Sequence, residues 1–344
     1  MKFAILPIFI PFISIFLNLI VSQASSKPTA IPIPSDNPMS ADKIELGKQL
    51  FFDARLSKNG TVSCSSCHNV MSGGEDNRTA SVGIEGKVGT RSSPTVWNAA
   101  FQSVMFWDGR AKDLETQAKG PLTNPIEMGM PNHDFVVQRI KQIPGYVSSF
   151  EKVFKSKDSL TIDNLAKAIA AYERTLISMN SPYDKFIAGN KSALTSEAQK
   201  GFETFKSVGC ISCHSGTNFS GPTLPQGIAF FQKFPMIPNQ DLEQKYNFSA
   251  DGGKFQVTKI ESDRNLFRVP TLRNIALTAP YFHNGAVKDL NEAIRVMAKL
   301  QLGKDLSAND VKSISSFLKS LTGEFPKQAL PQLPPSIGNS VITE

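Results

Sequence analysis

The sequence predicts a mainly α-helical protein made of two similar units in tandem. A short motif, Cys-x-x-Cys-His, occurs twice, at residues 64–68 and 210–214. Each copy follows a run whose apolar residues recur with the 3.6-residue period of an amphipathic helix. No stretch alternates polar and apolar residues over the length of a strand. The 344 residues are enough for two domains of the usual ~100 to 200 residues each.

The N-terminal segment predicts export from the cytoplasm. Lys2 precedes an apolar run over residues 3–21, and the small residues Ser22 and Ala24 follow it. This order is typical of a signal peptide, here residues 1–24, and it predicts a periplasmic protein. An uncleaved membrane anchor stays as the alternative, because the run is close to the ~20 residues of a spanning helix.

The first unit is expected to span residues 25–178. A lead-in rich in Pro and Ser, residues 25–38, precedes a helix that begins after Ser40 and leads into the first motif. Apolar residues at helical spacing predict another helix within residues 160–178, and Pro182 follows the end of that run.

The second unit is expected to span residues 179–322. After its motif, residues 215–270 have scattered Gly, Pro, Asn and Phe without a clear period, which predicts loop. Two helices are predicted near residues 288–302 and 307–322. The proline-rich C-terminal segment, residues 323–344, is expected to pack back on the first unit as irregular chain.

The net charge argues against one class of partner. The chain carries a formal charge of +7 at neutral pH, but the basic residues are spread thinly along it and form no run. A solvated basic surface explains this pattern better than a nucleic-acid site does. No nucleic-acid partner is therefore expected.

The repeated motif accounts for every cysteine in the chain. Cys64, Cys67, Cys210 and Cys213 form two pairs, and each pair is followed at once by a histidine. This is the attachment signature of a c-type haem, in which two thiols add to the vinyl groups and the adjacent imidazole binds the iron. A zinc site of cysteines needs four thiolates brought together, a thioredoxin-like site usually lies beside a βαβ pattern, and a disulfide does not explain the repeated histidine. The sequence predicts two covalently bound c-type haems.

Three further stretches carry a resemblance to a known family. They are FWDGRAKDLETQAKGPLTNPIEM at residues 106–128, TAPYFHNGAV at 278–287 and IRVMAKLQLG at 294–303. Together with the two motifs they closely resemble the bacterial diheme cytochrome c peroxidases over most of the chain. The resemblance implies two cytochrome c-like domains: the haem of one reacts with hydrogen peroxide, and the haem of the other receives electrons from a small cytochrome c or a cupredoxin. It also implies a homodimer with one Ca²⁺ ion between the domains.

The resemblance assigns the haem ligands. It makes His68 the proximal ligand of the peroxidatic haem and His214 the proximal ligand of the electron-transfer haem. Met297 falls where the family has the second axial ligand of the electron-transfer haem, and a Met/His pair raises the reduction potential. Leu290, Ile294 and Met297 also lie at helical spacing, so core packing stays as an alternative for Met297.

The resemblance also names residues for the reaction. Glu127 matches the catalytic acid–base, which takes a proton from one oxygen of hydrogen peroxide and delivers it to the other so that water leaves. Gln117 matches a second polar group on the same side. Trp107 matches a tryptophan between the haems, a relay for electrons that would also suit core packing, and His283 matches a position near the haem that is not an iron ligand. A glutamate with the ordinary pKa of ~4.3 is ionised at neutral pH and ready to accept the proton.

One departure from the family concerns access to the first haem. Ile84 stands where reductively activated members have an iron-binding histidine on the loop after the first motif, and no histidine occurs between His68 and His133. Because isoleucine cannot bind iron, the first haem is expected to be open, or to hold only water, in the oxidised protein. Met71 and Lys87 are the candidate substitute ligands.

A second departure concerns calcium. The positions whose backbone carbonyls bind the ion in the family are kept as Thr278 and Pro280, but the position of the asparagine ligand is Ser92. A serine hydroxyl is a weaker ligand for a hard cation than an amide oxygen. Calcium is therefore expected to bind less tightly than in the family.

Two other functions compete with peroxide reduction. An enzyme of the same fold oxidises a partner protein to mature a tryptophan-derived cofactor, but it has a tyrosine where Met297 stands. A diheme electron carrier without turnover is the second alternative. Glu127 and Gln117 argue against it, because a carrier needs no acid–base group beside its haem.

Overall fold

The computed structural model describes residues 30–338 and 340–342 and is mainly helical, as predicted. The predicted leader, residues 1–24, lies outside the described residues. Two short strands, β1 (Phe231–Lys233) and β2 (Leu266–Arg268), pair antiparallel. Among the described residues, no helix is both long and apolar enough to cross a bilayer. The helices are α1 (Ala41–Phe52), α2 (Cys64–Cys67), α3 (Leu114–Thr123), α4 (His133–Lys141), α5 (Pro144–Phe154), α6 (Ile162–Glu173), α7 (Pro182–Ile187), α8 (Ser196–Val208), α9 (Gln240–Tyr246), α10 (Phe255–Thr258), α11 (Leu290–Leu302) and α12 (Ala308–Lys319).

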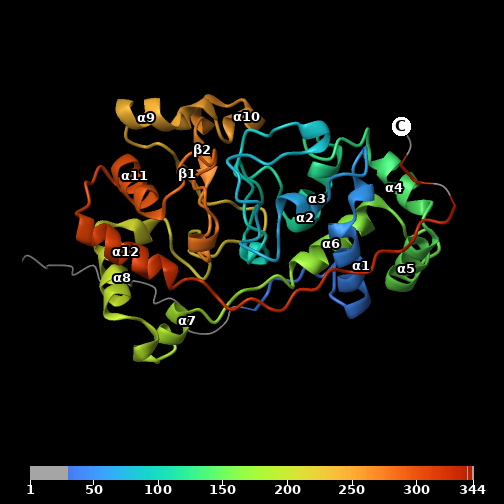
Figure 1. Cartoon of the computed structure of the whole chain (residues 1–344), viewed down its shortest axis with the longest axis horizontal. Coiled ribbons are helices and arrows are strands. Elements are labelled where there is room, and N and C mark those ends of the chain that lie inside the picture. Colours follow the sequence, from blue (N-terminus) through green and yellow to red (C-terminus); the bar gives the residue numbers. More distant parts are fainter. Residues whose placement is uncertain (1–29, 339, 343–344) are drawn as a thin grey trace, which may run out of the picture.

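The helices gather at the two ends of an elongated molecule. Figure 1 shows α1 to α6 at one end and α7, α8, α11 and α12 at the other, with long irregular segments between them. One large apolar core lies among α1, α3, α4, α5 and α6, and another lies among α7, α8, α11 and α12. These irregular segments form the middle of the molecule, between the two groups of helices.

Each end is built on one close helix crossing. A Cβ atom added to Gly47 of α1 would lie 1.8 Å from the backbone oxygen of Ala168 in α6. A Cβ atom added to Gly201 of α8 would lie 1.8 Å from the backbone oxygen of Ser313 in α12. Only glycine lets the helices approach this closely, because any other residue would place its Cβ inside the facing backbone. The same crossing in both ends agrees with the predicted tandem units.

The two ends also share a loop that the sequence prediction did not include. Residues 94–101 read PTVWNAAF and residues 270–277 read PTLRNIAL. Asn98 and Asn274 occupy matching places, and both have left-handed backbones with φ of 62° and 60°. Their side-chain amides both donate to the Ser178 hydroxyl, at 3.0 Å and 2.6 Å. Ser178 therefore joins the two repeated loops at the middle of the molecule.

The prediction of loop for residues 215–270 is wrong in part. Both strands, α9 and α10 lie in this segment. These elements span three to seven residues each, which is too short for a period of 3.6 or 2 to stand out. The helix predicted within residues 160–178 is present as α6 but ends earlier, at Glu173.

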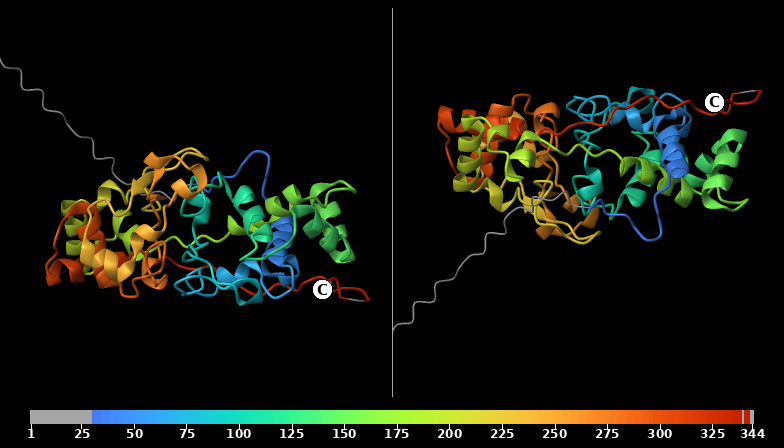
Figure 2. Two further views of the ribbon diagram at one scale, coloured as in Figure 1. Left: turned by 90° about the horizontal axis from the view of Figure 1, so that it is seen from above. Right: turned by 90° about the horizontal axis from the view of Figure 1, so that it is seen from below.

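The C-terminal segment runs back along the first end of the molecule (Figures 1 and 2). The ring of Phe325 packs edge-on against Trp97, with centroids 4.8 Å apart. The Arg55 guanidinium donates to the backbone oxygen of Pro334 at 2.9 Å, and Val341 is buried in the first core. These contacts attach the chain after α12 to the surface around α1.

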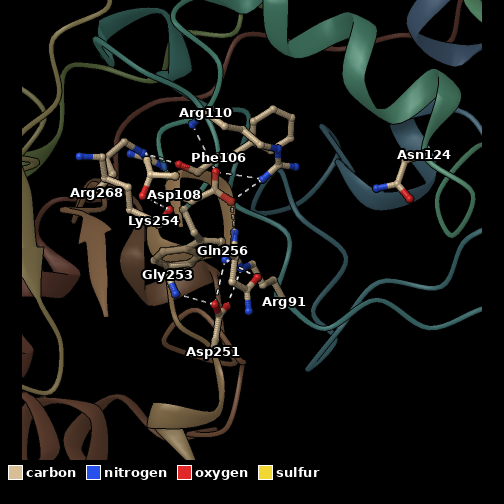
Figure 3. Close-up of polar contacts among 12 residues, drawn as sticks. Arg91, Phe106, Asp108, Arg110, Asn124, Asp251, Gly253, Lys254, Gln256 and Arg268 are labelled. Atoms are coloured by element: carbon tan, nitrogen blue, oxygen red, sulfur yellow. Dashed lines mark hydrogen bonds and ion pairs between the residues drawn. The ribbon is translucent and has the colours of Figure 1, made fainter. Parts of the chain in front are cut away.

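A buried ion-pair network, shown in Figure 3, joins distant segments at the middle of the molecule. Arg91 lies between two carboxylates and contacts Asp108 and Asp251 at 2.5 Å each. Asp108 also pairs with Arg110 at 2.8 Å. Burial opposes ionisation of Asp251, but the ion pair with Arg91 outweighs it, so the pKa of Asp251 is lowered.

Candidate active site

The first cavity, of about 520 Å³, contains the first motif. Cys64, Cys67 and His68 line it together with residues of α3, α6 and the segment before α3. The Nδ1 atom of His68 lies 3.3 Å from the Ser93 hydroxyl. Burial lowers the pKa of His68, so the imidazole is neutral at pH 7 and its Nε2 atom is left for a metal ion.

The second cavity, of about 220 Å³, contains the second motif. Cys210, Cys213 and His214 line it, and Met297 enters it from α11. The Nδ1 atom of His214 lies 3.1 Å from the backbone oxygen of Phe219. Because a carbonyl can only accept, Nδ1 carries the proton and Nε2 holds a free lone pair, which is the tautomer that binds metals. Met297 also packs against a neighbouring apolar cluster.

The chemistry of both cavities fits covalent haem. All four cysteines, which lie within the described residues, are free thiols. No group of three or more His, Cys, Asp or Glu side chains that could hold a metal ion occurs in the part of the chain that the structure describes. Each cavity has two thiols beside one imidazole, as c-type haem attachment requires.

A buried arginine supports the same conclusion. Arg268 lines both cavities and is buried, and its Nη1 atom has no hydrogen-bond partner. Its Nε atom donates only to the backbone oxygen of Phe106, at 3.1 Å. Burial lowers the pKa of Arg268 to about 10. The charge of Asp108 opposes this shift, and the propionates of a haem in either cavity would supply the buried guanidinium with an anionic hydrogen-bond partner.

Glu127 and Gln117 lie in the first cavity, as the resemblance implied. Gln117 comes from α3, and Glu127 follows that helix in a turn where Asn124 donates to its Oε1 atom at 2.8 Å. Burial raises the pKa of Glu127, against the opposing effects of Arg110 and the Asn124 bond. The pKa of Glu127 is therefore higher than the ordinary value expected from the sequence, and its ionised carboxylate is a stronger proton acceptor than that of a free glutamate.

Trp107 lines both cavities. Its indole N–H donates to the backbone oxygen of Ser92 at 2.8 Å, and its ring centroid lies 6.4 Å from that of His283. His283 lines the second cavity, stacks on Phe267 at 4.3 Å and places Nε2 3.1 Å from the Phe248 backbone oxygen. Burial lowers the pKa of His283 to about 4, so its ring is neutral.

Ile84 points into the first core and not into the first cavity. Its side chain is 1% exposed, and its Cδ1 would lie 2.1 Å from a Cβ added to Gly129. The Ile84 N–H donates to the backbone oxygen of Glu127 at 2.9 Å. Neither candidate substitute lines the cavity: Met71 is 52% exposed, and Lys87 pairs with Glu85 at 2.7 Å.

The three predicted calcium residues all line the second cavity, and one of them, Ser92, lines the first cavity as well. They are Ser92, Thr278 and Pro280. The backbone of Ser92 is engaged on both sides, because its N–H donates to the His283 oxygen at 2.8 Å and its oxygen accepts from Trp107. Their oxygens are neutral, and a site without carboxylates binds Ca²⁺ weakly.

Sequence reasoning missed two cavity residues, Arg268 and Glu173. Arg268 precedes the repeated loop at residue 270, so the repeat was the available signal. Glu173 follows Ile169 by four residues, and both line the first cavity. A charged residue on the apolar face of the predicted helix was the signal there.

Comparisons with known proteins agree with this geometry. The family model described as di-haem cytochrome c peroxidase matches residues 41–192. Cytochrome c551 peroxidase of Pseudomonas aeruginosa is 44% identical over 313 residues, which cover 89% of this chain and 87% of that protein. The methylamine utilization protein MauG of Methylorubrum extorquens is 33% identical over 319 residues, covering 90% and 86%. A crystal structure of a MauG-like protein associated with microbial copper homeostasis matches with a TM-score of 0.75 at 30% identity, covering 87% of this chain and 95% of that one. The chain therefore belongs to the di-haem cytochrome c peroxidase family.

Proposed function

We propose that the protein reduces hydrogen peroxide to water in the periplasm, with electrons from a small cytochrome c or a cupredoxin. The observation that carries this proposal is that the first cavity combines a haem-attachment motif with the carboxyl of Glu127 and the amide of Gln117. A relative at 44% identity is named a cytochrome c551 peroxidase, which supports the same activity and an electron-carrying partner.

The proposed roles follow from the positions of the side chains. Bound haem would supply the iron that accepts electrons and passes them to peroxide, with His68 and His214 as proximal ligands and Met297 as the second ligand of the electron-transfer haem. Glu127 takes a proton from one peroxide oxygen and returns it to the other, and Gln117 orients the peroxide by hydrogen bonding. Trp107 lies against both cavities and would be the side chain that relays electrons between the two haems.

The proposed domain division follows the two helix crossings. Residues 25–178 would form the peroxidatic domain, residues 179–322 the electron-transfer domain, and residues 323–344 would belong to the first domain through contacts such as that of Phe325 with Trp97. We also propose a signal peptide at residues 1–24 and a homodimer.

Steady-state assays separate this function from its two alternatives. Reduced small cytochrome c and hydrogen peroxide should give continuous turnover, whereas an electron carrier would give almost none. An enzyme that oxidises a partner protein is disfavoured by Met297, which lines the second cavity as an apolar side chain suited to iron ligation. The proposal fails if the holoprotein is reduced by donors but does not consume peroxide.

We propose that Ile84 leaves the first haem open in the oxidised protein, because it is held in the core and no candidate substitute lines the cavity. The EPR spectrum of the fully oxidised protein is expected to contain a high-spin ferric signal from the first haem. Peroxide turnover is expected to begin without a lag and without prior one-electron reduction. Two low-spin haems, with a lag that reduction removes, would show that another residue closes the site.

We propose a weak Ca²⁺ site formed by Ser92 and the carbonyls of Thr278 and Pro280, which line one cavity. Exhaustive chelation is expected to lower peroxide turnover or dimer formation, and added Ca²⁺ should restore it. A half-saturating Ca²⁺ concentration in the range of weak sites, roughly 10⁻⁴–10⁻³ M, is expected for such neutral ligands. If chelation changes neither property, the calcium proposal is wrong.

A further inference from the structure

A buried carboxyl group in the first cavity has no role in the reaction described above. Glu173 is the last residue of α6, lies 5% exposed and lines the cavity beside Ile169, one turn earlier. Its Oε2 atom is buried without a hydrogen-bond partner. α6 is the helix that packs against both α1 and α3 (Figure 1), so Glu173 is held by rigid elements at the cavity wall.

The charges around Glu173 do not neutralise it. Arg174, its neighbour in sequence, is committed to Glu115 of α3 through two hydrogen bonds of 2.7 Å and 2.9 Å. Burial raises the pKa of Glu173 to about 8, with Arg174 opposing and Glu115 reinforcing the rise. The other titratable neighbours are Cys64 of α2, whose thiol is consumed by haem attachment, and Tyr172. Burial raises the pKa of Tyr172, and the negative charges of Glu173 and of the exposed Glu45 of α1 add to this rise.

These surroundings make the proton on Glu173 sensitive to any further charge in the cavity. A ferric haem carries one more positive charge than a ferrous haem, and a nearby positive charge favours the ionised carboxylate. Loss of that charge on reduction favours the neutral carboxyl. Because coupling between two binding events is reciprocal, ionised Glu173 in turn stabilises the ferric state.

We propose that Glu173 takes up a proton when the first haem takes up an electron, an inference that rests on the proposed function. In a redox titration, one electron from the added reductant converts ferric to ferrous iron, and one solvent proton forms an O–H bond on a Glu173 carboxylate oxygen; both leave on reoxidation. Glu173 acts through the effect of its charge on the haem, and it is therefore a positioning residue.

Spectroelectrochemical titration of the holoprotein at several pH values tests the proposal. The midpoint potential of the first haem is expected to fall as pH rises through the neutral range in the wild type. In Glu173→Gln this fall should shrink to what Glu127, another carboxyl of the first cavity whose pKa burial raises, contributes, and the potential above neutral pH should be higher than in the wild type. The reduced-minus-oxidised infrared spectrum should contain the C=O band of a protonated carboxyl in the wild type and lack it in Glu173→Gln.

Two controls keep the result interpretable. Glu45→Gln removes an exposed negative charge from the same end of the molecule, and the potential of its first haem should keep the wild-type pH dependence. In Glu173→Gln, the potential of the second haem should also keep its wild-type pH dependence. If Glu173→Gln does not fold, Glu173→Asp, which keeps the titrating group, must retain the fall of potential with pH. A pH dependence of the first haem that is unchanged in Glu173→Gln would overturn the inference. Since no peroxide is present, failure of peroxide turnover with a normal titration would overturn only the proposed function.

Discussion

Replacing Glu127 by glutamine is expected to lower kcat for peroxide reduction by roughly 10²- to 10⁴-fold, the usual contribution of a positioned acid–base group. The amide keeps the size of the side chain but cannot accept and return a proton. Asn124 now donates to Glu127 Oε1 at 2.8 Å, and a glutamine oxygen can accept the same bond. The loss should therefore come from chemistry and not from a change in the shape of the cavity.

The pH dependence of the wild type gives a second test of Glu127. The Glu127 carboxylate must be ionised to accept a proton from peroxide. Burial raises the pKa of Glu127 above its ordinary value. The kcat/KM of the wild type is thus expected to fall as pH decreases through this raised pKa, and Glu127→Gln should lose that limb of the profile.

A matched control comes from the neighbouring loop. Glu85 is an exposed glutamate that pairs with Lys58 and Lys87, and it follows Ile84 on the loop that bonds to the Glu127 backbone. Glu85→Gln removes the same charge without touching the cavity and should keep near wild-type kcat. If Glu127→Gln turned over peroxide as fast as Glu85→Gln, Glu127 would not be the acid–base group.

Local chemistry explains what the sequence predicted well. The spacing Cys-x-x-Cys-His places two thiols and an imidazole within one turn, so it specifies a haem site without any long-range information. The periodic apolar residues predicted α1, α6, α8, α11 and α12 for a similar reason, since each helix buries one face along its own length. Glu127 and Gln117 lie in one cavity because Gln117 is in α3 and Glu127 is in the turn that follows it.

Long-range chemistry explains what the sequence did not predict. The raised pKa of Glu127 depends on burial, which a sequence does not show. Arg268 and Glu173 are buried in cavity walls by segments far away in the chain, although a charged residue on an apolar face hinted at Glu173. The inward direction of Ile84 depends on the core around Gly129, so its sequence position alone suggested only the loss of a ligand.

Replacing Arg91 by methionine is expected to lower the free energy of unfolding by about 3–5 kcal/mol, as when one partner of a buried ion pair is removed. Arg91 contacts Asp108 and Asp251 at 2.5 Å each (Figure 3). Asp108 would keep Arg110 as a partner, but Asp251 would keep only the backbone N–H of Gly253, at 2.8 Å. The variant therefore leaves a poorly compensated buried carboxylate where distant segments of the chain meet.

The sign of the pH dependence identifies the cause of that loss. In the wild type the pKa of Asp251 is lowered, so its stabilising contribution is present above the unfolded pKa of ~3.9 and is lost as pH falls through the lower folded pKa. Without Arg91, burial alone would raise the pKa of Asp251, and the folded state would bind more protons than the unfolded state. The difference in unfolding free energy between wild type and Arg91→Met should thus be larger at neutral pH than near pH 4, in denaturant titrations at both values. The control variant Arg264→Met breaks an exposed pair with Glu261 and should lower the free energy of unfolding by at most ~1 kcal/mol. A similarly small loss in Arg91→Met at neutral pH would show that the buried network contributes little to stability.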